Sequence, residues 1–256
     1  EAGSNFRPDI QGIRAIAVTL VLACHASIPW AKGGFIGVDV FYVLSGFLIT
    51  RLLLDDPRVP AFLIRRLFRI VPLAYLAMVI LAVVDGATGA QWLANLLFFA
   101  NLPPAHLLTG GQHLWSLCVE VQFYAGVALL VALAGRRGLY LLPLVAVAVT
   151  VVRAVAGETI SIVTWHRVDE ILAGATMALW YRNARWTGMA ARLPAITPLL
   201  LLPMLVAAGH HATGAFEYLR PYIAAATVGL SLVTAPAFLN RLMMSKPMAY
   251  VAETSY

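Results

Sequence analysis

The sequence predicts an all-α fold, a polytopic bundle of transmembrane helices, and three observations support this prediction. Of the 256 residues, 61% are hydrophobic and only 12% are charged, whereas soluble domains usually carry about a quarter charged residues. The mean hydropathy is +0.83. Apolar runs of about 17 to 25 residues, the length that crosses a bilayer, recur from end to end. Residues 1–256 are therefore expected to form a single integral-membrane domain.

The first two helices are expected at residues 13–28 and 35–54, separated by the turn "WAKGG". Because the second apolar run follows the first at once, the first is not expected to be a cleaved signal peptide. The stretch "DDPRVPAFLIRRLFRIVP" comes next and is rich in arginine. It is expected to be a cytoplasmic linker by the positive-inside rule, which also places the N-terminus in the cytoplasm.

Six further helices are expected at residues 71–84, 114–134, 139–155, 163–181, 193–208 and 221–239. With the run at 92–102, about nine apolar segments are present. That run has only about 11 residues, which is short for a span, so it either turns back within the membrane or crosses while tilted. If it turns back, the three later basic loops ("GRRG", 182–192 and 241–246) lie on the cytoplasmic side, as the positive-inside rule prefers. If it crosses, they fall outside.

The net charge of +6 comes from 18 Lys and Arg against 12 Asp and Glu. The basic residues lie in loops beside apolar runs, which indicates contact with anionic lipid and argues against a nucleic-acid partner. Cys24 and Cys118 both lie inside apolar runs, as buried cysteines usually do. We expect no disulfide, and the spacing of ligand-type residues indicates no metal site.

Ionisable residues inside spans are candidates for function, because a charge at bilayer depth costs at least about 2.5–3.5 kcal/mol on insertion scales. Arg14 and His25 are eleven positions apart, which places them on one face of a helix, about 16 Å apart. We expect both to line an internal cavity. Arg14 can also be explained as an arginine that snorkels to the interface. Histidine, with an ordinary pKa of about 6.5, is suited to act as a general base at neutral pH.

Two further groups extend this set of candidates. Glu120, in "LWSLCVEVQFY", is expected either to orient and balance an imidazole or to form a structural ion pair. Arg65 and Arg69, in "FLIRRLFRIVP", share a helix face with Arg66 beside them. Guanidinium groups at this spacing suit phosphate recognition, a role compatible with fixing the orientation of the chain.

The stretch "HRVDE", residues 166–170, combines two basic groups with two carboxylates at the start of an apolar run. We expect it to form a salt-bridge network that joins helices, with substrate binding as the alternative. Arg153 is another ionisable residue inside a run. The residues considered for contact with substrate are Asp39, Arg167 and Asp169.

Five stretches in order resemble the membrane-bound acyltransferase family 3, which includes bacterial O-acetyltransferases that act on cell-surface sugars. They are "FRPDIQGIRAIAV" with His25 following, "GGFIGVDVFYVLSGFLIT", "FLIRRLFRIVP", "LWSLCVEVQFY" and, more loosely, "RVDEILAGATMA". The resemblance covers residues 6 to about 180. It implies a ten-helix bundle that moves an acyl group, commonly acetyl, from acyl-CoA on the cytoplasmic side to an acceptor on the outer side.

The resemblance also implies roles for single residues. Arg14 and His25 match the arginine and histidine that the family needs on its first helix. The cluster at 65, 66 and 69 matches its cytoplasmic basic motif, where the phosphates of coenzyme A are expected. Glu120 matches the first acid of another motif, whose frequent second acid is replaced here by Val121. Family members usually continue past a sequence such as "VAETSY" into one more helix, so a tenth helix is expected to be missing.

The sequence is therefore interpreted as an acyl-CoA-dependent O-acyltransferase of the bacterial plasma membrane. Its acceptor would be a hydroxyl of a cell-surface glycan or of a lipid-linked molecule. His25 would act as the base, Glu120 would support the imidazolium, and Arg14 would anchor the donor or the helix. The alternatives are a transporter or flippase for a lipid-linked sugar, in which the same charges line a path, and a structural membrane subunit. The absence of internal repeats argues against transport.

Overall fold

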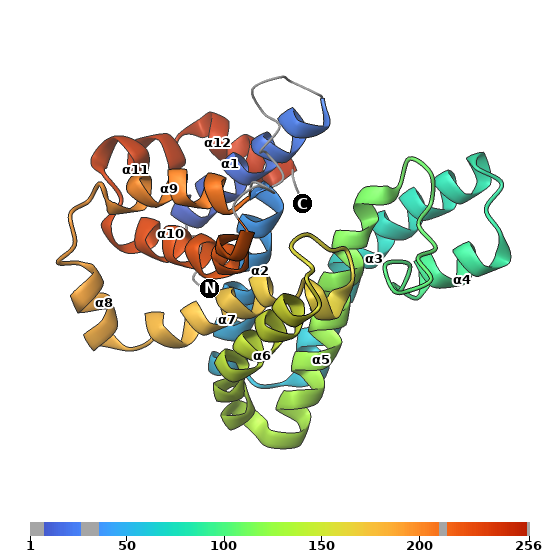
Figure 1. Cartoon of the computed structure of the whole chain (residues 1–256), viewed down its shortest axis with the longest axis horizontal. Coiled ribbons are helices and arrows are strands. Elements are labelled where there is room, and N and C mark those ends of the chain that lie inside the picture. The colour runs from blue at the N-terminus through green and yellow to red at the C-terminus, as the bar shows by residue number, and fades with distance from the viewer. Residues whose placement is uncertain (1–7, 27–35, 210–213, 255–256) are drawn as a thin grey trace, which may run out of the picture. The chain divides into compact units, whose positions relative to one another are not determined.

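The computed structural model describes residues 8–26, 36–209 and 214–254, and every regular element among them is a helix (Figure 1). This confirms the predicted all-α class. The chain forms two compact units. Unit 1 comprises residues 1–48 and 173–256, and unit 2 comprises residues 49–172. The boundaries between them fall inside α2 (Ile36–Asp55) and α7 (Asp169–Tyr181).

Unit 1 is built around the first helix. Its elements, besides parts of α2 and α7, are α1 (Pro8–His25), α8 (Ala184–Ala190), α9 (Thr197–Ala208), α10 (Arg220–Thr234), α11 (Ala237–Met243) and α12 (Lys246–Thr254). Helix α1 packs against α12 and α11, and α9 packs against α10. The predicted turn "WAKGG" and the predicted end of the first helix at Ile28 lie outside the described residues.

Unit 2 contains α3 (Val59–Val84), α4 (Gly89–Leu96), α5 (Trp115–Gly138) and α6 (Leu142–Val155). The chain reverses between α5 and α6 near Gly135, whose φ of 60° is one that glycine adopts readily. At this reversal the Nη2 atom of Arg136 donates to the carbonyl oxygen of Asp55, 2.7 Å away. The C-terminal ends of α2 and α5 are therefore neighbours.

The prediction that the arginine-rich stretch is a linker is wrong, because this stretch is helical from Val59 onward. Helix α3 begins at Val59, twelve residues before the predicted start at residue 71. Pro60 lies in the first turn, where a missing N–H costs nothing, and Pro72 is accommodated inside the helix. The residues between these two prolines form a continuous helical segment. The arginine cluster therefore has fixed helical spacing.

The short apolar run at 92–102 turns back on itself. Helix α4 has eight residues, which rise only about 12 Å. Phe98, with a φ of 59°, follows it, and the Nδ2 atom of Asn95 donates to the carbonyl oxygen of His106 over 2.8 Å. Residues eleven apart in sequence are thus side by side. This geometry favours the interpretation in which the run does not cross the membrane.

A ring of three side chains ties this turned-back segment to its neighbours. The Asn101 amide donates to the Thr164 hydroxyl (2.9 Å), which donates to the Gln122 carbonyl oxygen (2.6 Å), and the Gln122 amide donates to Asn101 (3.0 Å). Asn101 is fully buried. The ring joins the segment after α4, helix α5 and the segment after α6.

Three helical stretches among the described residues are long and apolar enough to cross a membrane: Ile36–Asp55, Val59–Val84 and Gln112–Val155. A bent pair, α10 with α11, would make a fourth. The sequence predicted nine apolar segments, of which several are shorter than expected or interrupted. Helix α7 begins only at Asp169, and the predicted helix at 221–239 breaks at Pro236 with a bend of 101°. The short helices α8 and α12 were not predicted.

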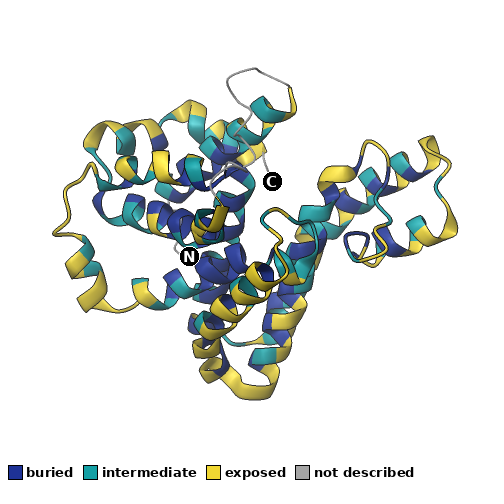
Figure 2. Cartoon of the chain, viewed as in Figure 1, coloured by how far each residue is buried: buried dark blue, intermediate teal, exposed yellow. Residues whose placement is uncertain are grey.

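Large apolar side chains remain exposed along the long helices of unit 2 (Figure 2). On α3 they include Phe68, which is 78% exposed, and on α5 they include Leu133, which is 79% exposed. Soluble proteins rarely leave such contiguous apolar surface in water, whereas a lipid-facing helix requires it.

Candidate functional site

Arg14 and His25 lie on one continuous helix, α1, as predicted. Eleven residues separate them, so they are about 16 Å apart along the helix axis. Their surroundings differ, because Arg14 is 9% exposed and the side chain of His25 is exposed. The expectation that both line one internal cavity stays a prediction, and His25 is the last residue of α1.

One hydrogen bond indicates the tautomer of the His25 imidazole. Its Nδ1 atom lies 2.9 Å from the carbonyl oxygen of Val21, one helical turn earlier. A carbonyl oxygen only accepts, so Nδ1 must carry the proton in this hydrogen bond. In the neutral ring the other nitrogen, Nε2, then has a lone pair and can accept a proton. This is the protonation pattern that a general base requires.

The three arginines predicted to bind phosphate occupy two faces of α3. Arg65 and Arg69 are exposed, whereas Arg66 is half-buried. The Nη2 atom of Arg65 lies 3.8 Å from the Oδ2 atom of Asp56, which is a loose ion pair. The cluster is thus divided into an exposed pair, one turn apart, and a third arginine on a neighbouring face.

Asp56 precedes this cluster and is paired mainly with Arg58. Two nitrogens of Arg58, Nε and Nη2, each donate to a carboxylate oxygen of Asp56 over 2.8 Å. These hydrogen bonds and the charge of the guanidinium lower the pKa of Asp56 to about 2. Both groups lie in the connection between α2 and α3. Asp56 is therefore a carboxylate under all physiological conditions.

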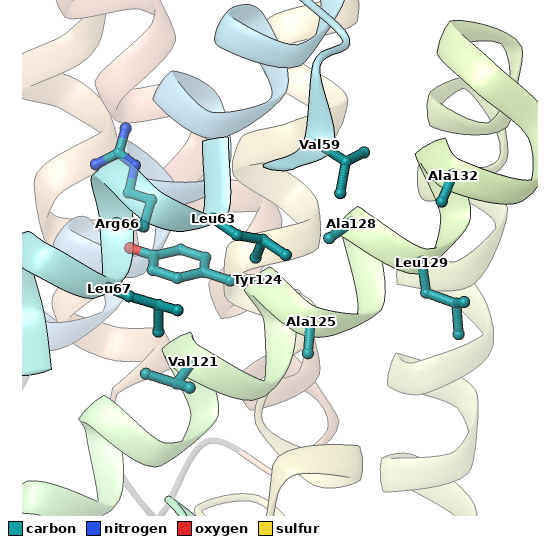
Figure 3. A pocket seen from close by; sticks show the side chains of 10 residues that line it. All are labelled: Val59, Leu63, Arg66, Leu67, Val121, Tyr124, Ala125, Ala128, Leu129 and Ala132. Atoms are coloured by element: carbon teal, nitrogen blue, oxygen red, sulfur yellow. The ribbon is translucent and has the colours of Figure 1, made fainter. Parts of the chain in front are cut away.

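A groove runs between α3 and α5 (Figure 3). It has a volume of about 440 Å³. Four lining residues come from α3 and six from α5: Val59, Leu63, Arg66, Leu67, Val121, Tyr124, Ala125, Ala128, Leu129 and Ala132. Arg66 is the one charged residue in this lining, and Tyr124 adds a hydroxyl.

Glu120 lies on α5 beside this groove and is half-buried. Its Oε1 atom accepts a hydrogen bond from the hydroxyl of Tyr124, one turn later. Tyr124 packs edge-on against Phe62 of α3, with ring centroids 5.9 Å apart. The carboxylate is thus held by a residue that itself lines the groove.

The predicted salt-bridge network around "HRVDE" is confirmed. Arg153 of α6 lies 3.1 Å from Asp169 and 3.6 Å from Glu170 of α7, and all three side chains are fully buried. Arg167 adds an ion pair of 2.8 Å to Glu170, and its guanidinium lies over the Trp115 ring, 5.6 Å from the centroid. Two positive and two negative groups balance one another, as buried charges require.

Asp39 forms a second buried ion pair, with Arg220 at the start of α10. The Nε atom of Arg220 lies 3.2 Å from the Oδ2 atom of Asp39, and neither side chain is exposed. The sequence analysis did not single out Arg220. The available signal was a lone arginine at the beginning of an apolar run, a position that usually indicates only a helix end.

The candidate residues are divided between the two units. Arg14, His25 and Asp39 belong to unit 1. Glu120 and the arginines of α3 belong to unit 2, together with Arg167 and Asp169. The structure brings Asp169 and Arg167 into one network through Glu170. The cooperation of His25 with Glu120 stays a prediction.

Comparison with known proteins identifies related sequences. The model of the acyltransferase 3 family, which describes an acyltransferase domain, matches residues 7–256. The peptidoglycan O-acetyltransferase OatA of Listeria monocytogenes is 37% identical over 145 residues, which are 46% of this chain and 23% of that protein. BcsY of Komagataeibacter xylinus, named as a membrane-bound transacylase, is 38% identical over 164 residues, which are 54% and 41% of the two chains. YrhL of Bacillus subtilis, named as a peptidoglycan O-acetyltransferase, is 36% identical over 142 residues, which are 46% of this chain and 22% of that protein.

These matches span less than half of the length of each relative. No solved structure matches the chain.

Proposed function

Because the chain belongs to the acyltransferase 3 family, we propose that it transfers an acyl group, in the first instance acetyl, from acyl-CoA to a hydroxyl of a cell-envelope glycan. A lipid-linked acceptor would serve the same chemistry. The names of the relatives, which include peptidoglycan O-acetyltransferases, support the choice of an acetyl group and of a glycan acceptor. The observation that carries the proposal is the tautomer of His25, which leaves a proton-accepting nitrogen on an exposed side chain.

The acyl donor would bind at the exposed arginines of α3. Arg65 and Arg69 are one turn apart, and each guanidinium can donate two hydrogen bonds to one phosphate. We place the phosphates of coenzyme A against this pair. Arg66, the third arginine that the sequence assigns to the cluster, lines the groove between α3 and α5 instead.

His25 would act as the general base. Its Nε2 atom takes the proton from the acceptor hydroxyl as the oxygen attacks the thioester carbonyl carbon. The new C–O bond forms, the C–S bond breaks, and the leaving thiolate receives the proton from the imidazolium. The hydrogen bond from Nδ1 to Val21 persists through both states, since Nδ1 carries a proton in the neutral and the charged ring.

Glu120 and Arg14 would support this step. We propose that the carboxylate of Glu120 balances the imidazolium of His25, and that Tyr124 holds the carboxylate in position. Arg14, buried in unit 1, would anchor the donor or the helix. Asp39, Arg167 and Asp169 stay predictions for contact with the acceptor; each is buried in an ion pair.

The proposed orientation places the N-terminus in the cytoplasm. If the run at 92–102 does not cross, the basic loops at 135–138, 182–192 and 241–246 all face the cytoplasm, as the positive-inside rule prefers. The hydrogen bond between Arg136 and Asp55 supports this orientation, because it joins two loops that are both proposed to lie on the cytoplasmic side.

The direct test measures transfer of radiolabelled acetyl groups from acetyl-CoA to cell-wall glycan by the purified protein in vesicles. We expect His25→Ala to lower the rate by about 10²- to 10⁴-fold, the usual contribution of a general base. His106→Ala, a loop histidine outside the proposed site, is the matched control and should keep the parent rate.

Two outcomes would contradict the proposal. Unchanged transfer in His25→Ala would remove the assignment of the base. If the folded parent protein neither binds acetyl-CoA nor transfers label, but moves a lipid-linked sugar between leaflets, the chain would be a transporter.

A further inference from the structure

We propose that the groove between α3 and α5 binds an anionic phospholipid, with an acyl chain along its apolar floor and the phosphodiester against Arg66. This proposal concerns a lipid site beside the proposed coenzyme site and does not rest on the proposed acyl transfer.

The groove has the shape and chemistry that an acyl chain requires. Its floor consists almost entirely of Val, Leu and Ala side chains (Figure 3). On α5 the lining extends from Val121 to Ala132, about 16 Å along the helix. A second groove of about 550 Å³ shares Val59 and Ala132 with the first and continues it toward Pro57. Together they form one elongated and mainly apolar surface, with Arg58 in the lining of the second groove.

Arg66 supplies a positive charge at this surface. Its side chain is half-buried, and among the residues that the structure describes it has neither an ion-pair nor a hydrogen-bond partner. Arg58 and Arg65, by contrast, both lie against Asp56. A half-buried guanidinium without a counterion favours an anionic ligand, and its planar donors fit a phosphate.

The surroundings select a lipid over a soluble phosphate. A small anion at Arg66 would leave the apolar floor exposed, whereas a phospholipid covers the floor and neutralises the charge. Ile64 and Phe68, on α3 beside the groove, are exposed apolar residues of the kind that face lipid tails. The end of the groove at Val59 and Ala132 lies beside the Asp55–Arg136 contact, on the side proposed to be cytoplasmic. Anionic lipids are concentrated in that leaflet.

The test uses two photoactivatable lipids that carry the same diazirine-labelled acyl chain, one phosphatidylglycerol and one phosphatidylcholine. Each is incorporated at equal amount into phosphatidylcholine nanodiscs that contain the full chain, and the labelled peptides are mapped by mass spectrometry. We expect phosphatidylglycerol to label peptides containing Leu63, Leu67 and Leu129 about fivefold more than phosphatidylcholine does, because one arginine near an anionic headgroup favours it by about that factor.

Two variants separate the headgroup contact from the acyl-chain contact. Arg66→Gln should remove the preference for phosphatidylglycerol, whereas Arg65→Gln, the adjacent exposed position, should keep it. Ala125→Trp fills the groove from an exposed position and should lower labelling by both lipids. Leu133→Trp, on the same helix but outside the groove, should not. The comparison of the two lipids on the parent chain needs no variant, so a variant that fails to fold leaves the proposal testable.

Equal labelling by the two lipids on the parent chain would overturn the proposal, since it would show only lipid that surrounds the protein without selection. Full preference in Arg66→Gln would overturn the assignment of the phosphate to that residue. Displacement of phosphatidylglycerol from the groove by coenzyme A would show that the groove binds the acyl donor. Displacement by inorganic phosphate alone would show that Arg66 binds a soluble anion. Either result would refute a lipid site.

Discussion

The hydrogen bond from His25 to Val21 assigns a role to each nitrogen of a single imidazole. Nδ1 is committed to the backbone of its own helix, and Nε2 is the atom that remains for chemistry. An asparagine at this position could keep a donor near the Val21 carbonyl but would offer no basic nitrogen. The side chain is therefore held by the helix that presents it.

Asp56 provides a pH-dependent prediction. Its pKa is lowered to about 2, first by the hydrogen bonds from Arg58. A lowered pKa in the folded state means that the interaction stabilises the fold above the unfolded pKa of about 4 and is lost as the pH falls toward 2. We expect the carboxyl carbon signal of Asp56, followed by NMR, to titrate near 2.

In Arg58→Gln the same signal should titrate close to the ordinary value for aspartate, 3.8. An Asp56 signal that titrates at the same pH in the parent and in the variant would show that Arg58 is not the cause of the lowered pKa.

The buried ion pair between Arg153 and Asp169 provides a prediction about stability. Removing one partner of a buried pair leaves the other charge uncompensated and typically costs about 3–5 kcal/mol. Arg153→Met should therefore lower the free energy of unfolding by about that amount, measured by denaturation in detergent micelles. The double variant Arg153→Met with Asp169→Leu should recover part of the loss, because it removes both charges.

A double variant no more stable than Arg153→Met would show that Asp169 is not the principal partner of Arg153. Recovery in the double variant would also show that apolar side chains can replace this ion pair with little loss of stability.

At this scale the sequence predicted pairs that depend on local spacing and missed pairs that depend on tertiary packing. Arg14 and His25 share a face of α1 because eleven positions are close to three turns. The partner of Asp39 is 181 positions away, and no periodicity in the chain indicates Arg220. Likewise, the arginine spacing predicted that Arg65 and Arg69 share a face, but the half-burial of Arg66 in the groove with α5 depends on tertiary packing.

Among the elements, α7 approaches α2 with backbone contact inside unit 1. A Cβ atom added to Gly174 would lie 2.0 Å from the carbonyl oxygen of Val43, closer than any real contact. Small residues allow this kind of approach between membrane helices, where packing replaces the hydrophobic effect as the attractive term. Gly12 permits a similar approach of α1 to Met243.

Substitution of Gly174 tests this packing. Gly174→Ala should destabilise the protein by about 1–3 kcal/mol, the usual cost of overpacking, because backbone atoms must move. Gly126→Ala on α5 is the matched control, since its Cβ would meet nothing within 4 Å. The control should be neutral or more stable by up to about 1 kcal/mol, because alanine favours helix. Thermal unfolding in micelles measures both, and equal effects would refute the close approach.

The element boundaries show which sequence signals were reliable. The start of α2 was predicted within one residue, because apolar character changes sharply there. The start of α3 was missed because prolines and charges were taken as signs of a linker, although proline suits the first turn of a helix. The break between α10 and α11 at Pro236 follows from the missing N–H of proline, which the length of the apolar run concealed.

On the scale of the whole molecule, each unit contains a balanced set of buried charges. Unit 1 contains the Asp39–Arg220 pair, and unit 2 contains the network of two arginines and two acids. The remaining arginines of unit 2 gather at the ends of α2, α3 and α5. In a membrane this distribution specifies an orientation as well as a fold.

Cysteine accessibility tests that orientation. In a background with Cys24 and Cys118 replaced by alanine, a single cysteine at Arg137 should resist a membrane-impermeant maleimide in intact bacteria and react after permeabilisation. A single cysteine at Glu158, in the connection between α6 and α7, should react in intact cells. Both positions are exposed, so the difference reports the side of the membrane. The opposite pattern would reverse the proposed orientation and place the 135–138 loop outside.

The ring of Asn101, Gln122 and Thr164 has a consequence for how the turned-back segment behaves. Within the ring, each of the three side chains donates one hydrogen bond and accepts one, so the ring is closed only when all three side chains are present. The amides of Asn101 and Gln122 also donate to the backbone carbonyl oxygens of Ile162 and Phe98, so the three side chains form five hydrogen bonds in all. Because Asn101 takes part in three of these five bonds, replacing that one side chain should weaken the attachment of the segment after α4 to both of its neighbours at once.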